Sequence, residues 1–213
     1  AIPPSPSGGC ALRFEYPAGT YTTSFGGGRA EYAISGQPMD LYIGAWMRYS
    51  SPFQFHPVGQ KVNFFILGGG GGSCRNVAFG FGGGPYYTAT PQICWGGGTY
   101  VNYANKSAWD ATAHLNEWHW YEMRIKVNTP GGADGIAEMW IDDVLHLQHF
   151  NVRFRDVGDT AGIGSMQHTA EFGGGGSVLN QNQYWWVDHT VLSTSFIGKP
   201  TGGVIASDTQ LPS

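Results

Sequence analysis

The sequence predicts an all-β protein, a two-sheet antiparallel jelly-roll sandwich. Apolar and polar residues alternate with period two in short runs rich in Tyr, Phe, Trp, Val and Ile. Gly, Pro, Asn and Ser separate these runs and favour turns. So many strands cannot form one open sheet without curling, so we expect two packed antiparallel sheets.

The run at residues 40–50 shows the alternation clearly. Its apolar set is expected to face the core and consists of Leu41, Ile43, Ala45 and Met47. Its intervening set is expected to face outward and consists of Tyr42, Trp46 and Arg48.

Residues 118–128 and 135–143 repeat the pattern on either side of the turn sequence "NTPGGADG", which predicts a hairpin. The inward set is Tyr121, Met123, Ile125, Val127, Ala137, Met139 and Ile141. Glu122 and Glu138 are expected to join Arg124 in a surface ion-pair ladder. The sequence has no Glu-x-Asp-x-Glu triplet of a retaining glycosidase, so we expect no hydrolase of that type.

The remaining expected strands are 11–16, 30–35, 60–67, 75–81, 99–104, 149–155, 166–172 and 183–194. The only helical candidate is the short stretch 106–116. The length suits one domain over 1–213. Its Pro/Gly/Ser-rich ends, 1–9 and 200–213, are expected to run over the surface.

Glycine runs follow an aromatic residue at Phe25, Phe81, Trp95 and Phe172. Glycine permits positive φ and close passage of a loop over a ring. Two interpretations follow. The aromatic residues plug the ends of the core, or flat loops with exposed rings form a platform for sugar rings.

Composition excludes some partners. The net charge is -4 and only 12% of residues are charged, so no basic stripe exists to bind nucleic acid. No run approaches the ~18 apolar residues that a membrane span needs.

The cysteines bear on the redox environment. Cys74 and Cys94 could close a loop of about 20 residues, which would stabilise the fold by roughly 3 kcal/mol and leave Cys10 unpaired. Three free buried thiols are the alternative. A disulfide favours an extracellular setting or a particle surface.

Three segments, 41–67, 117–146 and 172–198, resemble the concanavalin A-like jelly-roll proteins allied to polysaccharide lyases, the alginate and glucuronan lyase relatives. The first carries "FQFHPVGQKVNFFIL", the second "EWHWYEMRIKVN" and a hairpin ending in Trp-x-Asp, and the third "FGGGGSVLNQNQYWWVD". The resemblance implies a domain that meets polysaccharide on one sheet, and such relatives include both enzymes and non-catalytic binders.

A polysaccharide lyase must neutralise a uronate carboxylate, remove the C5 proton and protonate the leaving oxygen. The candidates for these tasks are His56, Arg48, Lys61, Asn63, Tyr103 and Gln167. Adjacent pairing is expected to gather Arg48, Lys61 and Asn63 on one face. For His56, a structural hydrogen-bonding role is the alternative.

Sugar-stacking candidates are Tyr42, Trp46, Tyr86, Tyr87, Trp95 and Tyr103. The leading hypothesis is therefore an extracellular polysaccharide-binding domain, with lyase activity as the enzyme hypothesis. The alternative hypothesis, from another functional class, is a self-assembling structural or adhesive subunit of a particle surface.

The sequence contains few patterns that are typical of a metal site. No histidine pair has the helix-face spacing of a zinc site, and His146 and His149 are expected to diverge. Scattered aspartates could supply a structural calcium ion: Asp134, Asp142, Asp143, Asp156, Asp159 and Asp188. For Asp188, capping of the final strand pair is the alternative.

Overall fold

The structure is a computed structural model that describes residues 5–21, 28–68, 75–93, 99–100, 107–173 and 176–201. These residues form strands and one short 3-10 turn, η1 (Ala111–His114). The strands are β1 (Leu12–Tyr16), β2 (Arg29–Ala33), β3 (Asp40–Tyr49), β4 (Gln60–Leu67), β5 (Arg75–Phe81), β6 (Tyr87–Ile93), β7 (Thr99–Tyr100), β8 (His119–Lys126), β9 (Gly135–Ile141), β10 (Val144–Val152), β11 (Ile163–Phe172) and β12 (Gln183–Ser193). In this part of the chain no helix is long and apolar enough to cross a membrane.

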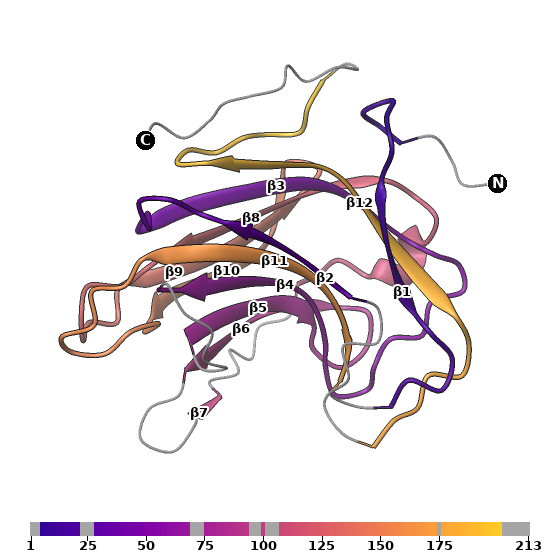
Figure 1. The fold of residues 1–213 in the computed structure, drawn as a ribbon, viewed down its shortest axis with the longest axis horizontal. Helices are drawn as coiled ribbons and strands as arrows, with labels where there is room; N and C mark the ends of the chain where they lie inside the picture. Colours follow the sequence, from indigo (N-terminus) through magenta and orange to yellow (C-terminus); the bar gives the residue numbers. More distant parts are fainter. Residues whose placement is uncertain are drawn as a thin grey trace.

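The strands form two six-stranded sheets (Figure 1). The first sheet has the order β1-β12-β3-β8-β9-β10 and the second the order β2-β11-β4-β5-β6-β7. All pairings within them are antiparallel. The sequence-based prediction of a two-sheet antiparallel jelly-roll sandwich is confirmed.

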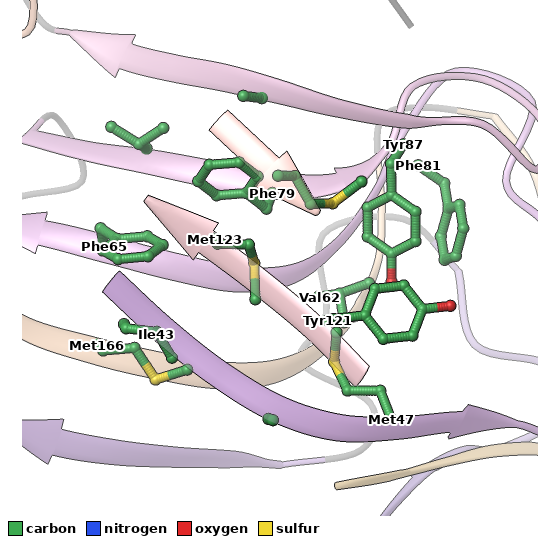
Figure 2. Close-up of a cluster of buried hydrophobic side chains, with 14 of the residues drawn as sticks. Ile43, Met47, Val62, Phe65, Phe79, Phe81, Tyr87, Tyr121, Met123 and Met166 are labelled. Carbon is green, nitrogen blue, oxygen red and sulfur yellow. The ribbon is translucent and has the colours of Figure 1, made fainter. Parts of the chain in front are cut away.

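The core lies between the inner faces of the two sheets. Figure 2 shows side chains from both sheets meeting there, among them Ile43 and Met123 from the first and Phe65 and Phe79 from the second. The side chains predicted to face inward on β3, β8 and β9 are all buried, and so is Val127, which follows β8. This confirms the face assignments. Burial of this apolar area is the main stabilising term of the fold.

The predicted hairpin is β8–β9, with Met123 opposite Met139. Arg124 binds both oxygens of Asp40, at 2.8 and 2.7 Å, and Glu138 at 2.9 Å. The ion-pair ladder is therefore confirmed for Glu138. Glu122 does not join it and instead accepts backbone hydrogen bonds from a distant segment, described below.

Three elements differ from their predicted form. Strand β6 is absent from the expected strands; it contains Pro91, yet it pairs with β5 along its whole length. Strand β10 begins at Val144, five residues before the predicted start. The helical candidate at 106–116 contains only the four-residue η1, which Asp110 caps through Thr112.

The glycine run after Phe81 turns the chain at the rim of the second sheet. Gly83 and Gly84 have φ of +81° and +94°, as the sequence predicted. A Cβ at Gly83 would lie 2.7 Å from the Pro57 carbonyl oxygen, whereas one at Gly84 would meet nothing within 4 Å. The run therefore serves both positive φ and a close backbone approach.

This pair of glycines predicts two distinct losses of stability. Gly84→Ala should lower the free energy of unfolding by about 1 kcal/mol, because only the left-handed backbone penalises the Cβ. Gly83→Ala should cost about 2–3 kcal/mol, because its Cβ also collides with Pro57. Urea unfolding of both variants measures the difference. Equal losses would show that the approach of Pro57 plays no part.

Candidate functional site

The structure places Arg48 and Lys61 on opposite outer faces of the sandwich. Arg48 lies on β3 in the first sheet and Lys61 on β4 in the second, so the two strands are not neighbours. The prediction that one face gathers Arg48, Lys61 and Asn63 is therefore wrong.

Arg48 is engaged in the fold. Its Nε donates to the Asn116 carbonyl oxygen at 2.9 Å and its Nη2 to Asn116 Oδ1 at 2.8 Å. The guanidinium also lies over the Trp186 ring, 4.7 Å from its centroid. Burial lowers the pKa of Arg48 from its ordinary value, and these contacts tie the loop before β8 to β3.

Tyr42 and Trp46 do point outward from the first sheet, but the chain itself covers them. Residues 194–201, here called the closing segment, run across this face. Phe196 makes an edge contact with Tyr42, and the Lys199 ammonium lies 5.4 Å from the Trp46 ring centroid. A platform open to water at these two rings was predicted, and the structure fills it with the protein's own side chains.

The closing segment is fastened by Glu122. Its carboxylate is fully buried on the outer face of β8 and accepts hydrogen bonds from the backbone N–H groups of Ile197 at 2.8 Å and Gly198 at 2.9 Å. Burial raises the pKa of Glu122 above its ordinary value.

Asn63 faces the core rather than solvent. A β-bulge between Lys61 and Asn63 turns both Val62 and Asn63 inward, so Lys61 and Asn63 do not share a face. Asn63 Oδ1 lies 2.6 Å from His168 Nδ1, and His168 Nε2 lies 2.9 Å from Thr190 Oγ1 on β12. This triad joins the two sheets through the core.

His56 is also buried. Its Nδ1 accepts hydrogen bonds from the backbone N–H groups of Val58 and Gly59, both at 3.1 Å. Burial lowers the pKa of His56 from its ordinary value. The geometry favours the structural alternative, a histidine that shapes the loop between β3 and β4.

Two of the predicted rim aromatics, Tyr86 and Tyr87, differ in their exposure. Tyr86 is exposed, whereas Tyr87 is fully buried with its hydroxyl against that of Tyr49, so Tyr87 does not present a ring to a ligand. Four further predictions, on Tyr103, Trp95, Cys74 and Cys94, fall outside the described residues. Cys10 is an exposed free thiol.

The aspartates considered for calcium each bind a partner within the chain. Asp134 accepts from the Thr129 amide, Asp188 from Ser7, and Asp143 from the Lys199 amide. Asp142 binds His119, Asp156 binds Arg153, and Asp159 accepts from the Ala161 amide.

The outer face of the second sheet carries a continuous set of polar side chains, here called the polar face. Its members are Arg29, Glu31, Lys61, Ser165, Gln167 and Glu171. Alternation along β11 explains it. Met166, His168, Ala170 and Phe172 face inward, whereas Ser165, Gln167 and Glu171 face out. Register then places Glu31 beside Gln167 and Lys61 beside Glu171.

Hydrogen bonds and ion pairs organise the polar face. Ser165 donates to Glu31 at 2.8 Å, and this bond is the main reason why the pKa of Glu31 lies below its ordinary value; a bond from Gln167 adds to the effect. Lys61 pairs with Glu171. Arg29 lies 3.9 Å from Glu31 and is half-exposed.

This arrangement offers amide, carboxylate and cationic groups to a polar ligand. Paired charges and an amide present donors and acceptors to hydroxyl groups, and Arg29 offers a fork for a carboxylate. Of the predicted catalytic residues, the polar face brings together Lys61 and Gln167. Sequence reasoning missed Arg29, Glu31 and Glu171, although the alternation in "RAEYA" places Arg29 and Glu31 on one face.

No protein-family model and no curated protein matches the chain. Among solved structures, alginate lyase Aly36B matches with a TM-score of 0.66 at 18% identity, over 85% of this chain and 80% of that one. A variant of that enzyme was solved with an alginate tetrasaccharide. Endo-β-1,4-glucuronan lyase from the fungus Trichoderma reesei matches with a TM-score of 0.60 at 17% identity, over 87% and 82% of the two chains. Alginate lyase vAL-1 from Chlorella virus matches with a TM-score of 0.62 at 18% identity, over 85% and 84%.

These likenesses concern architecture, which matches over most of both chains, while the sequences have diverged. The chain has the β-sandwich fold of polysaccharide lyases.

Proposed function

We propose that the chain binds a uronate-containing polysaccharide outside the cell through its polar face and cleaves it by β-elimination. The main observation that supports this proposal is the contrast between the outer faces of the two sheets. The closing segment occupies the aromatic face of the first sheet, whereas the polar face presents Arg29, Glu31 and Lys61 partly exposed around Gln167. The lyase fold and the alginate oligosaccharide in a lyase of the same fold support the proposal.

Within this proposal Arg29 and Lys61 meet the uronate carboxylate, and Gln167 positions the sugar. Neutralising that carboxylate acidifies the C5 proton, which is the first requirement of elimination. Tyr103 stays the sequence prediction for the group that moves the proton.

The test combines turnover and binding on a panel of uronate polymers. Elimination creates an unsaturated product, so ultraviolet absorbance reports cleavage directly. We expect Arg29→Ala to lower kcat/KM, or the affinity where no cleavage occurs, by about tenfold or more, because it removes a charged contact to substrate.

Arg13→Ala is the matched control. Arg13 lies 3.8 Å from Glu15 on β1 of the first sheet, and its side chain is 51% exposed against 50% for Arg29. Its substitution should leave binding and turnover unchanged. If both variants lose activity equally, or if no uronate polymer is bound or cleaved, the proposal fails.

A further inference from the structure

Three potential metal ligands converge at one end of the sandwich, away from the polar face. They are His114 at the end of η1, Glu117 in the following loop and His119 at the start of β8, and their ligand atoms all lie within 4.8 Å of one another. His114 Nδ1 and His119 Nε2 each lie 3.2 Å from the same oxygen, Glu117 Oε2.

The two 3.2 Å separations match edges of a coordination tetrahedron. Zinc bonds to imidazole nitrogen and carboxylate oxygen measure about 2.0–2.1 Å, so neighbouring ligand atoms of a tetrahedral ion lie about 3.3 Å apart. The two edges that end on Glu117 Oε2 have about that length, and the ligand nitrogens of the two histidines lie within 4.8 Å of each other.

Metal-bound histidines typically donate a hydrogen bond from their other ring nitrogen to a carboxylate or carbonyl group, and His119 has such a partner. Its Nδ1 lies 2.7 Å from Asp142 Oδ2, so Nδ1–H donates a hydrogen bond to that carboxylate and the lone pair of Nε2 is directed at Glu117. Asp142 is itself fixed, because its other oxygen accepts from the Trp120 amide at 3.1 Å and pairs with Lys199 at 2.8 Å.

Trp109 packs against His114, the other histidine of the site. Its ring stacks on His114 with centroids 3.9 Å apart and planes 13° apart, and it makes an edge contact with His119. The His119 side chain is only 13% exposed, so this histidine is oriented from two sides.

We propose that His114, Glu117 and His119 bind one divalent first-row transition-metal ion, with Zn²⁺ as the best match. Two imidazoles and one carboxylate are the donor set that zinc accepts, whereas Ca²⁺ and Mg²⁺ require mainly oxygen. The three protein ligands leave one position for water. Sequence spacing did not reveal the site, because the histidines lie on a 3-10 turn and a strand rather than on one helix face.

A bound ion joins the loop at 110–117 to β8 and, through Asp142, to the turn between β9 and β10. Binding to the folded chain alone raises its stability by mass action. At a Zn²⁺ concentration about 100 times Kd, Tm should rise by about 5–10 °C.

The test is calorimetric titration of the full chain, first stripped with EDTA, with ZnCl₂, followed by visible spectroscopy with CoCl₂. We expect one saturable Zn²⁺ site and the intense d–d bands of tetrahedral Co²⁺. His114→Ala and His119→Ala should each weaken binding at least about tenfold, and Asp142→Asn should weaken it by about 10–100-fold.

Asp143→Asn, on the same turn, is the matched control and should leave Kd unchanged. Circular dichroism confirms that each variant is folded. An unchanged Kd in folded His119→Ala, the absence of saturable Zn²⁺ binding, or an octahedral Co²⁺ spectrum of the unsubstituted chain overturns the proposal. Activity on polysaccharide is not a readout, so this result is independent of the proposed function.

Discussion

His168→Phe should lower the free energy of unfolding by about 2–5 kcal/mol. The ring of Phe fits among the apolar neighbours of His168, but it leaves Asn63 Oδ1 and the Thr190 hydroxyl without their partner. Each buried polar group left unpaired costs about 1–3 kcal/mol. His168→Gln retains a donor and an acceptor and should cost much less. Urea unfolding of both variants at neutral pH measures the difference, and equal losses would show that packing alone matters here.

The same triad predicts acid sensitivity. Burial lowers the pKa of His168 from 6.5 to about 3, so at intermediate pH the unfolded chain binds a proton that the folded chain does not. Stability is therefore present above the unfolded pKa and is lost as pH falls. From about pH 7 to about pH 4 this group removes about 3 kcal/mol.

Comparison with His168→Gln isolates this contribution. The raised pKa of Glu122 has the opposite sign, since that group favours the folded chain as pH falls, and it is present in both proteins. The unfolding free energy of the native chain should therefore fall more steeply on acidification than that of His168→Gln. Parallel curves would contradict the assignment of His168 as a buried neutral histidine.

Local periodicity predicted the inner faces of β3, β8 and β9 because side chains of a strand alternate by geometry alone. The same rule failed at β4, where a bulge breaks the alternation and sends Asn63 inward next to Val62. A bulge depends on the neighbouring strands. Gly80 shows this dependence, because a Cβ there would lie 2.1 Å from the Gln60 carbonyl oxygen, a contact that no local pattern contains.

Alternation also reveals which residues share a face of a strand but not which sheet receives the strand. Arg48 and Lys61 were predicted to meet because β3 and β4 follow one another, yet the chain crosses to the other sheet between them. Gln167 lies on the polar face because β11 pairs with both β2 and β4, an arrangement set by contacts over more than a hundred residues. The covering of Trp46 by residues near the end of the chain is equally non-local.

Glu122→Ala should detach the closing segment and lower the free energy of unfolding by about 2–4 kcal/mol. The carboxylate holds two backbone N–H groups of the segment, and hydrogen bonds to a charged group contribute about 1.5–3 kcal/mol each. Glu122→Gln keeps one acceptor oxygen and should give an intermediate loss. Limited proteolysis should cut within 194–201 faster in Glu122→Ala than in Glu122→Gln, and slowest in the unsubstituted chain.

The same variant separates the two outer faces as glycan sites. Once the segment detaches, Trp46 loses the Lys199 ammonium and Tyr42 loses Phe196, so tryptophan fluorescence should shift to longer wavelength. If the polar face is the binding site, this exposure leaves the affinity for a uronate polymer unchanged, because the two faces lie on opposite sides of the sandwich. A clear gain in affinity on release would instead place sugar recognition on the aromatic face, with the closing segment as its cover.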